Sequence, residues 1–389
     1  MPKQIIKGFI SQIRGVSYKP TDVVDAENGT PIIRANNIQD DGMIYDDLVF
    51  VAQQRIKDNQ LLKKGDIVIC TSSGSKNLVG KATTFSGYKT DMSFGAFCKV
   101  VRISSSSVNP DYIRLFFKSK TYREQISASS TGANINNIKT DHIDNLIINI
   151  PPVETQNIAV RELSTLIKSI SIKKQQLSAL NELVKSRFIE MFGDPLSNSK
   201  GYDLSDYGSL FELNAGGTPS KNKPEYWENG NISWIGSNMC QDTILYENDG
   251  KYITELGFNN SSARMFPKNT VLVALVGATI GKTALLKFET TTNQNVLGIL
   301  GIEESGNNPY FVFYYTQGLH KFFMDISDGG FAMASKGFIS KLPFPIVDIS
   351  LQNDFADFVK LIDKSKFIVQ KQIDDLQELL DSKMDEYFG

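Results

Sequence analysis

The pattern of hydrophobic and polar positions is most regular towards the C-terminus. Between Leu351 and Tyr387, apolar residues follow each other at alternating intervals of four and three, and only Ser365 and Lys383 interrupt the stripe. This period predicts a long helix with one narrow packing face, as in a coiled coil. Residues 153–193 carry the same pattern and align without a gap on residues 349–389, and both stretches end in Phe-Gly. The chain therefore contains an internal duplication.

The two helices are expected to pair with each other. The C-terminal copy is acidic, whereas the middle copy carries Lys173, Lys174 and Lys185. Polar seam positions are exchanged between the copies, since Lys173 corresponds to Val369, and such exchanges fix register. Two unrelated surface helices would require the alignment to be chance. The predicted helix-pairing residues are Leu166, Ile170, Leu177, Leu180 and Val184 in one helix and Ile362, Val369, Ile373, Leu376 and Leu380 in the other.

The segments before the two helices also repeat in order. Each begins with a short strand, a turn and a second strand that ends near asparagine, followed by a strand-loop-strand segment at 65–81 or 269–282. A short helix after Asn109-Pro110 or Asn308-Pro309 and a Gly-rich loop complete each copy. The strand and turn signals predict two α+β modules. We expect a first module at 1–150, a central helix at 151–195, a second module at 196–347 and a C-terminal helix at 348–389.

Composition narrows the class of protein. A chain of 389 residues with 41% hydrophobic residues is expected to fold into several domains in the cytoplasm. No signal peptide is recognisable, and the longest apolar run is too short to cross a bilayer. Three scattered cysteines and two histidines assemble neither a disulfide framework nor a metal site. The net charge of −2 argues mildly against a nucleic-acid binder, although a local basic patch would suffice.

Three motifs approach catalytic signatures and fall short. The run from Gly277 to Thr283 has one residue too few between its glycines for a phosphate loop, and a strand follows it. Asn308-Pro309-Tyr310 lacks one proline of the Asn-Pro-Pro-Tyr motif of amino-group methyltransferases, and a helix cap followed by proline explains it. Pro110-Asp111 has no carboxylate-x-Lys partner of a nuclease. None of the three motifs therefore supports catalytic chemistry.

What remains are loops that combine glycine with amides, hydroxyls and a few cations. Lysine and arginine neutralise phosphates, and Asn, Gln and Arg read base edges, so these loops are candidates for DNA contacts. The alternative is that they are ordinary turns. The candidates are Arg34, Asn36, Asn37, Ser73, Lys76, Asn77, Lys81, Asn134, Asn136, Asn137 and Lys139 in the first module, and Lys221, Asn222, Lys223, Trp234, Ser237, Asn238, Thr279, Lys282, Ser335 and Lys336 in the second.

In this order and duplication, the motifs resemble the specificity (S) subunit of type I restriction-modification systems, over essentially the whole chain. The most specific motif is Pro151-Pro152 followed by Gln156 at the start of the central helix. Residues 32–38, 216–220 and 280–282 add to it. The second copy has Val347-Asp348 in place of the two prolines and keeps Gln352.

The resemblance implies two target-recognition domains separated by two antiparallel coiled-coil helices, in a pseudo-twofold, circular organisation. Each domain would read one half of a bipartite, asymmetric site on double-stranded DNA. The helices would dock two methyltransferase subunits, which bind S-adenosylmethionine, and restriction subunits, which use ATP and Mg²⁺. This chain would itself bind no cofactor and catalyse no reaction. A helix of this length spans roughly 60 Å, against ~34–36 Å for a duplex turn, which suits a spacer. A two-module scaffold for proteins is the main alternative, ahead of a module with its own nuclease or methyltransferase activity.

Overall fold

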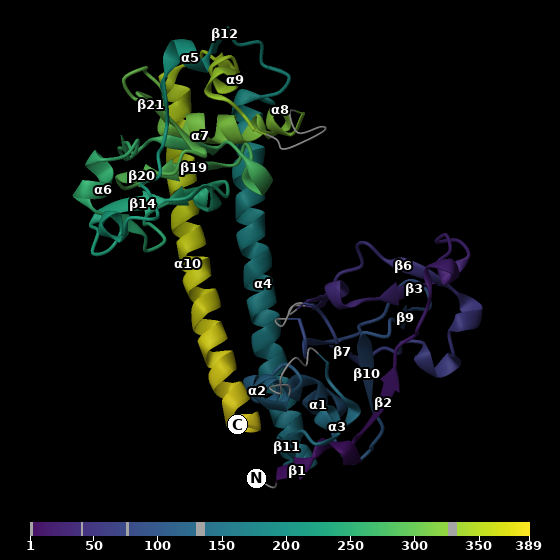
Figure 1. Cartoon of the computed structure of the whole chain (residues 1–389). Helices are drawn as coiled ribbons and strands as arrows, with labels where there is room; N and C mark the ends of the chain where they lie inside the picture. Colours follow the sequence, from purple (N-terminus) through teal and green to yellow (C-terminus); the bar gives the residue numbers. More distant parts are fainter. Residues whose placement is uncertain (1–2, 40–41, 75–77, 130–136, 326–332) are drawn as a thin grey trace. The chain divides into compact units, whose positions relative to one another are not determined.

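The computed structural model describes residues 3–39, 42–74, 78–129, 137–325 and 333–389 (Figure 1). The chain divides into two compact units. The first comprises Met1–Lys174 together with Lys371–Gly389, and the second comprises Gln175–Gln370. Each unit therefore combines one mixed α/β module with parts of both long helices.

The two long helices are α4 (Val153–Phe192) and α10 (Ile349–Phe388), each of 40 residues. They begin and end at matching positions of the duplicated stretch, as its apolar stripe predicts. In the first unit the hydroxyl of Tyr387, near the end of α10, donates to Glu162 in the early part of α4 at 3.0 Å. In the second unit Phe355, near the start of α10, packs on Phe188 near the end of α4 with ring centroids 5.3 Å apart. Within each unit, the start of one helix thus meets the end of the other.

The predicted seam residues occupy the less exposed face of each helix. The buried ones are Ile170, Val184, Ile362, Val369, Ile373 and Leu380, and the half-buried ones are Leu166, Leu177, Leu180 and Leu376. The periodicity did not single out Leu163, Phe188 and Phe192, which are also buried. Because Phe188 and Phe192 belong to the core of the second module, the buried face of α4 there is wider than a coiled-coil seam.

The module of the first unit contains two main sheets. One is antiparallel, in the order β2-β10-β7-β8, and the other has the order β6-β3-β9, with β3 and β9 parallel. Their strands are β2 (Ile10–Arg14), β10 (Cys98–Ile103), β7 (Ile67–Cys70), β8 (Ala82–Thr84), β6 (Val49–Ala52), β3 (Gly29–Ile33) and β9 (Ser93–Phe94). The smaller pairs are β1 (Lys3–Ile5) with β11 (Ile147–Asn149) and β4 (Ile38–Gln39) with β5 (Gly42–Met43), and the helices are α1 (Pro110–Phe116), α2 (Lys120–Ser129) and α3 (Thr140–Asp144).

The module of the second unit repeats the two main sheets, each with one further strand. Its sheets have the orders β13-β21-β18-β19-β15 and β16-β14-β20-β17, with β15 and β19 parallel in the first and β14 and β20 parallel in the second. The strands are β13 (Glu212–Ala215), β21 (Val296–Leu300), β18 (Val271–Ala274), β19 (Thr283–Leu286), β15 (Thr243–Leu245), β16 (Tyr252–Ile253), β14 (Ile232–Ile235), β20 (Thr290–Thr292) and β17 (Met265–Phe266). A short pair joins β12 (Leu204–Asp206) to β22 (Pro343–Pro345), and the helices are α5 (Tyr207–Leu210), α6 (Glu255–Asn259), α7 (Pro309–Gly318), α8 (His320–Asp325) and α9 (Lys336–Ser340).

Local sequence explains the central elements. The continuous apolar runs of β7 and β18 are fully buried, as expected of strands covered on both faces. Asn109 and Asn308 cap α1 and α7, each accepting a bond from the main-chain N–H two residues on, with proline at the first helical position. The run after Gly277 continues into strand β19, so the strand predicted after that phosphate-loop-like sequence is confirmed.

A buried glutamine ties each module to the helix that follows it. Gln156 in α4 accepts the main-chain N–H of Asn109 at 2.8 Å and donates to the carbonyl of Pro151 at 2.7 Å. Gln352 in α10 accepts the N–H of Asn308 at 2.8 Å and donates to Val347. Both glutamines are almost completely buried. The glutamine of the Pro-Pro-x-x-x-Gln motif therefore joins the start of a long helix to the cap of α1 or α7.

The same short helix of each module also packs on the Phe-Gly terminus of the other long helix. Phe388 of α10 packs on Tyr112 of α1 in the first unit, with ring centroids 4.8 Å apart. Phe192 of α4 packs on Phe311 of α7 in the second, at 4.7 Å. Each module is therefore held between the start of one long helix and the end of the other.

Replacing either glutamine with leucine should destabilise the protein. Gln156→Leu and Gln352→Leu keep a side chain of similar size but leave buried main-chain groups without a partner, at about 1–3 kcal/mol for each such group. Urea unfolding of the full chain would measure the loss. Ser164→Ala, at an exposed position of α4, serves as the control and should change stability by less than about 0.5 kcal/mol. Equal losses for Gln156→Leu and Ser164→Ala would contradict the role of the buried amide.

Candidate nucleic-acid interface

Main-chain hydrogen bonds bring three loops of the first unit together. The carbonyl of Phe97, in the turn between β9 and β10, accepts the N–H of Thr71 at 2.8 Å. The carbonyl of Thr71, in the loop between β7 and β8, accepts the N–H of Ile138 at 2.7 Å. Ile138 lies in the segment that leads from the Gly-rich loop into α3. We call Thr71, Phe97 and Ile138 the first junction.

The second unit contains the same arrangement. The carbonyl of Asn295 accepts the N–H of Leu275 at 2.8 Å, and the carbonyl of Leu275 accepts the N–H of Ala334 at 2.9 Å. These residues, which we call the second junction, lie between β20 and β21, between β18 and β19, and before α9. Two of the predicted candidate loops therefore meet in each unit, together with a turn that sequence reasoning did not select.

In each module a glycine after the first strand of the main sheet lets the chain pass close to the turn that carries Phe97 or Asn295. A Cβ on Gly15 would lie 2.0 Å from the carbonyl oxygen of Gly95, and one on Gly216 would lie 2.5 Å from that of Asn293. Such contacts are far inside van der Waals distance, so each position requires glycine. The Gly-Val-Ser and Gly-Gly-Thr-Pro-Ser sequences are thus explained by a close approach of backbones.

The cluster of Arg34, Asn36 and Asn37 forms one turn after β3. Arg34 donates to the carboxylate of Asp47 at 2.7 Å, and Asn36 also lies within 3.5 Å of that carboxylate. Asn37 is fully buried, accepts the N–H of Arg34 and donates to Asp46. Its prediction as a DNA-contacting residue is corrected, because the amide is used up inside the turn. Arg34 and Asn36 remain at the surface.

The candidates around the first junction are only partly described. Ser73 and Lys81 are half-buried, and Asn137 and Lys139 are exposed. Asn137 forms a bridge with Ser72, which joins the Gly-rich segment to the β7–β8 loop. Lys76, Asn77, Asn134 and Asn136 lie outside the described residues.

In the second unit, two tryptophans hold the Gly-Gly-Thr-Pro-Ser loop. The indole N–H of Trp234 donates to the carbonyl of Gly217 at 3.2 Å, and that of Trp227 donates to Ser220 at 3.1 Å. Trp234 is buried, so its predicted contact with DNA is corrected to a role in positioning the loop. The loop presents the exposed residues Lys221, Asn222 and Lys223. Lys223 donates to the hydroxyl of Tyr226 at 2.9 Å.

The other candidates of the second unit lie in short turns. Asn238 is exposed and Ser237 half-buried in the 3-10 turn Ser237–Met239. Lys282 donates to Gln241 at 2.8 Å, and the hydroxyl of Thr279 donates to Val276 at 3.4 Å. Ser335 caps α9 by accepting the N–H of Phe338, and Lys336 beside it is exposed. Ser335 therefore has a structural role whether or not it also contacts a ligand.

Comparison with known proteins now decides the family. A family model described as "Type I restriction modification DNA specificity domain" matches residues 10–182 and again residues 199–378. The chain belongs to this family. The two matches correspond to the two repeated modules with their helices.

Several relatives carry the same family name. The type I restriction enzyme StySPI specificity subunit of Salmonella potsdam is 41% identical over 44% of this chain and 37% of its own length. The EcoKI specificity subunit of Escherichia coli K12 is 40% identical over the same shares. The match thus spans little more than a third of each of these relatives. A solved S subunit from M. genitalium has a TM-score of 0.53 at 14% identity, covering 100% of this chain and 96% of that one, which supports the fold.

Thiol chemistry does not contribute at the first junction. Cys70 and Cys98 are direct cross-strand neighbours between β7 and β10, behind Thr71. Burial raises the pKa of both thiols, and it raises that of Cys240 to about 12. All three cysteines are therefore protonated and lie in the core. Among the described residues, no group of three His, Cys, Asp or Glu side chains is placed to hold a metal ion.

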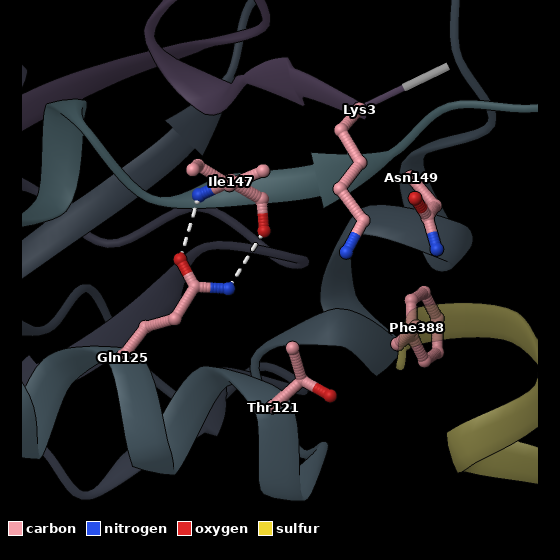
Figure 2. Close-up of a pocket in the computed structure, with 6 residues that line it drawn as sticks. All are labelled: Lys3, Thr121, Gln125, Ile147, Asn149 and Phe388. Atoms are coloured by element: carbon pink, nitrogen blue, oxygen red, sulfur yellow. Dashed lines mark hydrogen bonds between the residues drawn. The ribbon is translucent and has the colours of Figure 1, made fainter. Parts of the chain in front are cut away.

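In a small pocket of the first unit, polar side chains bond to the main chain of neighbouring elements (Figure 2). It is lined by Lys3, Thr121, Gln125, Ile147, Asn149 and Phe388. Gln125 donates to the carbonyl of Ile147 and accepts its N–H, at 2.8 and 2.7 Å, while Asn149 donates to the carbonyl of Gly389 at 3.2 Å. Lys3 is its one ionisable side chain, so the pocket lacks a paired acid and base.

In the described parts of the chain, no helix is both long and apolar enough to span a membrane.

The requirement for glycine at position 15 is directly testable. Gly15→Ala should push the turn away from the first loop, which costs about 1–3 kcal/mol of stability by overpacking, and should weaken DNA binding through the displaced junction. Thermal unfolding and DNA-binding titrations would measure both effects. The control is Gly8→Ala, because a Cβ there has no atom within 4 Å. Wild-type stability in Gly15→Ala would contradict the close approach.

Proposed function

We propose that this chain is the DNA-recognition subunit of a type I restriction-modification complex and reads a bipartite, asymmetric site with one module for each half-site. The observation that carries the proposal is the repeated three-loop junction in a chain of the DNA specificity domain family. Each junction gathers loops rich in glycine, amides, hydroxyls and cations, which are the groups that contact phosphates and base edges. The proposed target-recognition domains are residues 1–150 and 196–347.

The differences between the two junctions support an asymmetric site. Thr71 and Phe97 of the first junction correspond to Leu275 and Asn295 of the second. Thr71 and Leu275 are buried, so the difference at the surface is an exposed aromatic ring in one module where the other has a half-buried amide. Two modules with a common scaffold and different loop chemistry would read different half-sites.

The two long helices would form the spacer. In the proposed arrangement α4 and α10 pair antiparallel as a coiled coil, and each module is joined to the start of one helix and the end of the other, which gives pseudo-twofold, circular symmetry. Support comes from the matching contacts Gln156 to Asn109 and Gln352 to Asn308. The proposed helical segments are 151–195 and 348–389.

The helices would also dock the partner subunits. Apolar side chains remain exposed along them: Ile172 is 51% exposed, Leu361 62%, Phe367 72% and Ile368 56%. In the second unit Phe188, Tyr310, Tyr314 and Phe367 line a common groove. A solved structure that is 14% identical to this chain comes from work on complex assembly and conformational transition of the type I R-M system. We infer that two methyltransferase subunits and restriction subunits bind here. Those subunits would carry S-adenosylmethionine, ATP and Mg²⁺, while this chain supplies specificity without catalysis.

The role in methylation can be tested in cells. Methylome sequencing of strains with and without the gene for this chain should show one bipartite adenine-methylation motif that disappears on deletion. Affinity purification of the full chain should recover two copies of a methyltransferase subunit. Recovery of unrelated proteins with an unchanged methylome would favour a scaffold instead.

The salt dependence of DNA binding should report the number of phosphate contacts. Each neutralised phosphate contributes about 0.9 to the slope of log binding constant against log salt concentration. Lys139→Ala and Lys336→Ala should each lower that slope by about 1 in the assembled complex, with little change in the preferred sequence. The slope of the isolated chain should be smaller than that of the complex, since partners would supply further contacts. Equal slopes would contradict that division.

A further inference from the structure

Phe97 is an exposed aromatic residue at the first junction. Its side chain is 68% exposed, and in the described part of the first unit it is the one aromatic side chain that is exposed. Other phenylalanines of the same unit, such as Phe94 and Phe116, are fully buried. An isolated exposed phenylalanine would be unremarkable on a surface. Its backbone environment makes this one different.

The turn that carries Phe97 is held on three sides. The N–H of Cys98 donates to Gly95 at 2.9 Å, which closes the turn, and the N–H of Gly95 donates to Ile33 at 2.9 Å. The carbonyl of Phe97 accepts from the N–H and the hydroxyl of Thr71, at 2.8 and 3.0 Å, and from the N–H of Ser72 at 3.2 Å. A firmly held main chain therefore presents an uncovered ring, which reduces the entropy that would be lost on binding.

Cationic candidates flank the turn through its own hydrogen-bond partners. Arg34 is the residue after Ile33, which accepts the N–H of Gly95, and the exposed Lys139 is the residue after Ile138 of the junction. Arg34 is paired with Asp47, so the exposed Lys139 is the cation beside the turn that is open to a phosphate, and a phosphate bound there would bring the ring towards the bases. Proteins that bend DNA use such apolar side chains as wedges, which separate neighbouring base pairs.

We propose that Phe97 inserts as a wedge into a base step of the half-site read by the first module. This inference rests on the proposed function and deepens it, because it assigns DNA distortion to one module alone. The corresponding position of the second module is Asn295, whose carbonyl makes the equivalent bond to Leu275. The second module lacks a ring at this place and reads its half-site without this wedge.

The experiment uses the full chain with its co-purified methyltransferase subunits and a duplex that carries the site mapped by methylome sequencing. 2-Aminopurine, whose fluorescence rises on unstacking, replaces one base at a time, and the methylated adenines are left unsubstituted. The wild-type complex should brighten one step of one half-site. Phe97→Ala should abolish that signal and weaken binding about 10- to 100-fold, the range expected for loss of one aromatic stacking contact. The salt slope should not change, because the ring carries no charge.

Two variants control for folding and for position. Phe97→Trp should retain the fluorescence signal, since the larger ring can also stack. Asn295→Ala should leave the signal of the first half-site unchanged. Unfolding curves of Phe97→Ala should match those of the wild type, because the ring is exposed.

The outcomes separate the wedge from the proposed function. If wild type and Phe97→Ala bind DNA equally and brighten it equally, the wedge is overturned and the proposed function stands. The wedge is also overturned if the wild type gives no brightening but loses affinity when uracil replaces thymine, because that result indicates contact with a thymine methyl group. A Phe97→Ala chain that fails to bind its methyltransferase subunits would overturn the wedge as well. A wild-type complex that shows no preference for the mapped site would overturn the proposed function as well.

Discussion

The two buried glutamines impose the constraint on which the architecture depends. Gln156 and Gln352 each join a long helix to the N-terminal cap of a short helix in the preceding module, with nearly identical distances. A buried amide with both ends bonded is specific in a way that apolar contacts are not, because any shift of the helix leaves polar groups without partners. The angle and register at which the helix leaves the module are therefore fixed at one residue. Phe388 and Phe192 of the other long helix then pack on the same short helices, at Tyr112 and Phe311.

These contacts explain why the compact units do not follow the order of the chain. The first unit needs the end of α10 for its aromatic core, and the second needs the end of α4. The matching ends differ in chemistry: Tyr387 bonds to Glu162 in the first unit, whereas the guanidinium of Arg187 lies 6.0 Å from the ring centroid of Phe358 in the second. The end of each helix thus has a specific partner on the other helix. This favours pairing of α4 with α10 over pairing of either helix with a second copy of itself.

The junctions show how one scaffold can carry two different surfaces. The bonds that assemble them are main-chain bonds, from Thr71 to Phe97 in one unit and from Leu275 to Asn295 in the other. Because main-chain groups are common to all residues, the side chains at these positions can change without loss of the junction. Gly15 and Gly216 are the exceptions, since the backbones approach too closely there for any side chain.

The sequence by itself determined the duplication, the apolar period of both long helices, the caps at Asn109 and Asn308, and the loops that bear the candidate residues. These features are local, so periodicity and turn chemistry reveal them. Only the tertiary structure decided which loops meet, because the bonds between Thr71, Phe97 and Ile138 join residues far apart in the chain. It also showed that Asn37 and Trp234 face inward and that Phe97 faces outward. Their exposure depends on the packing of distant strands, about which composition and spacing carry no information.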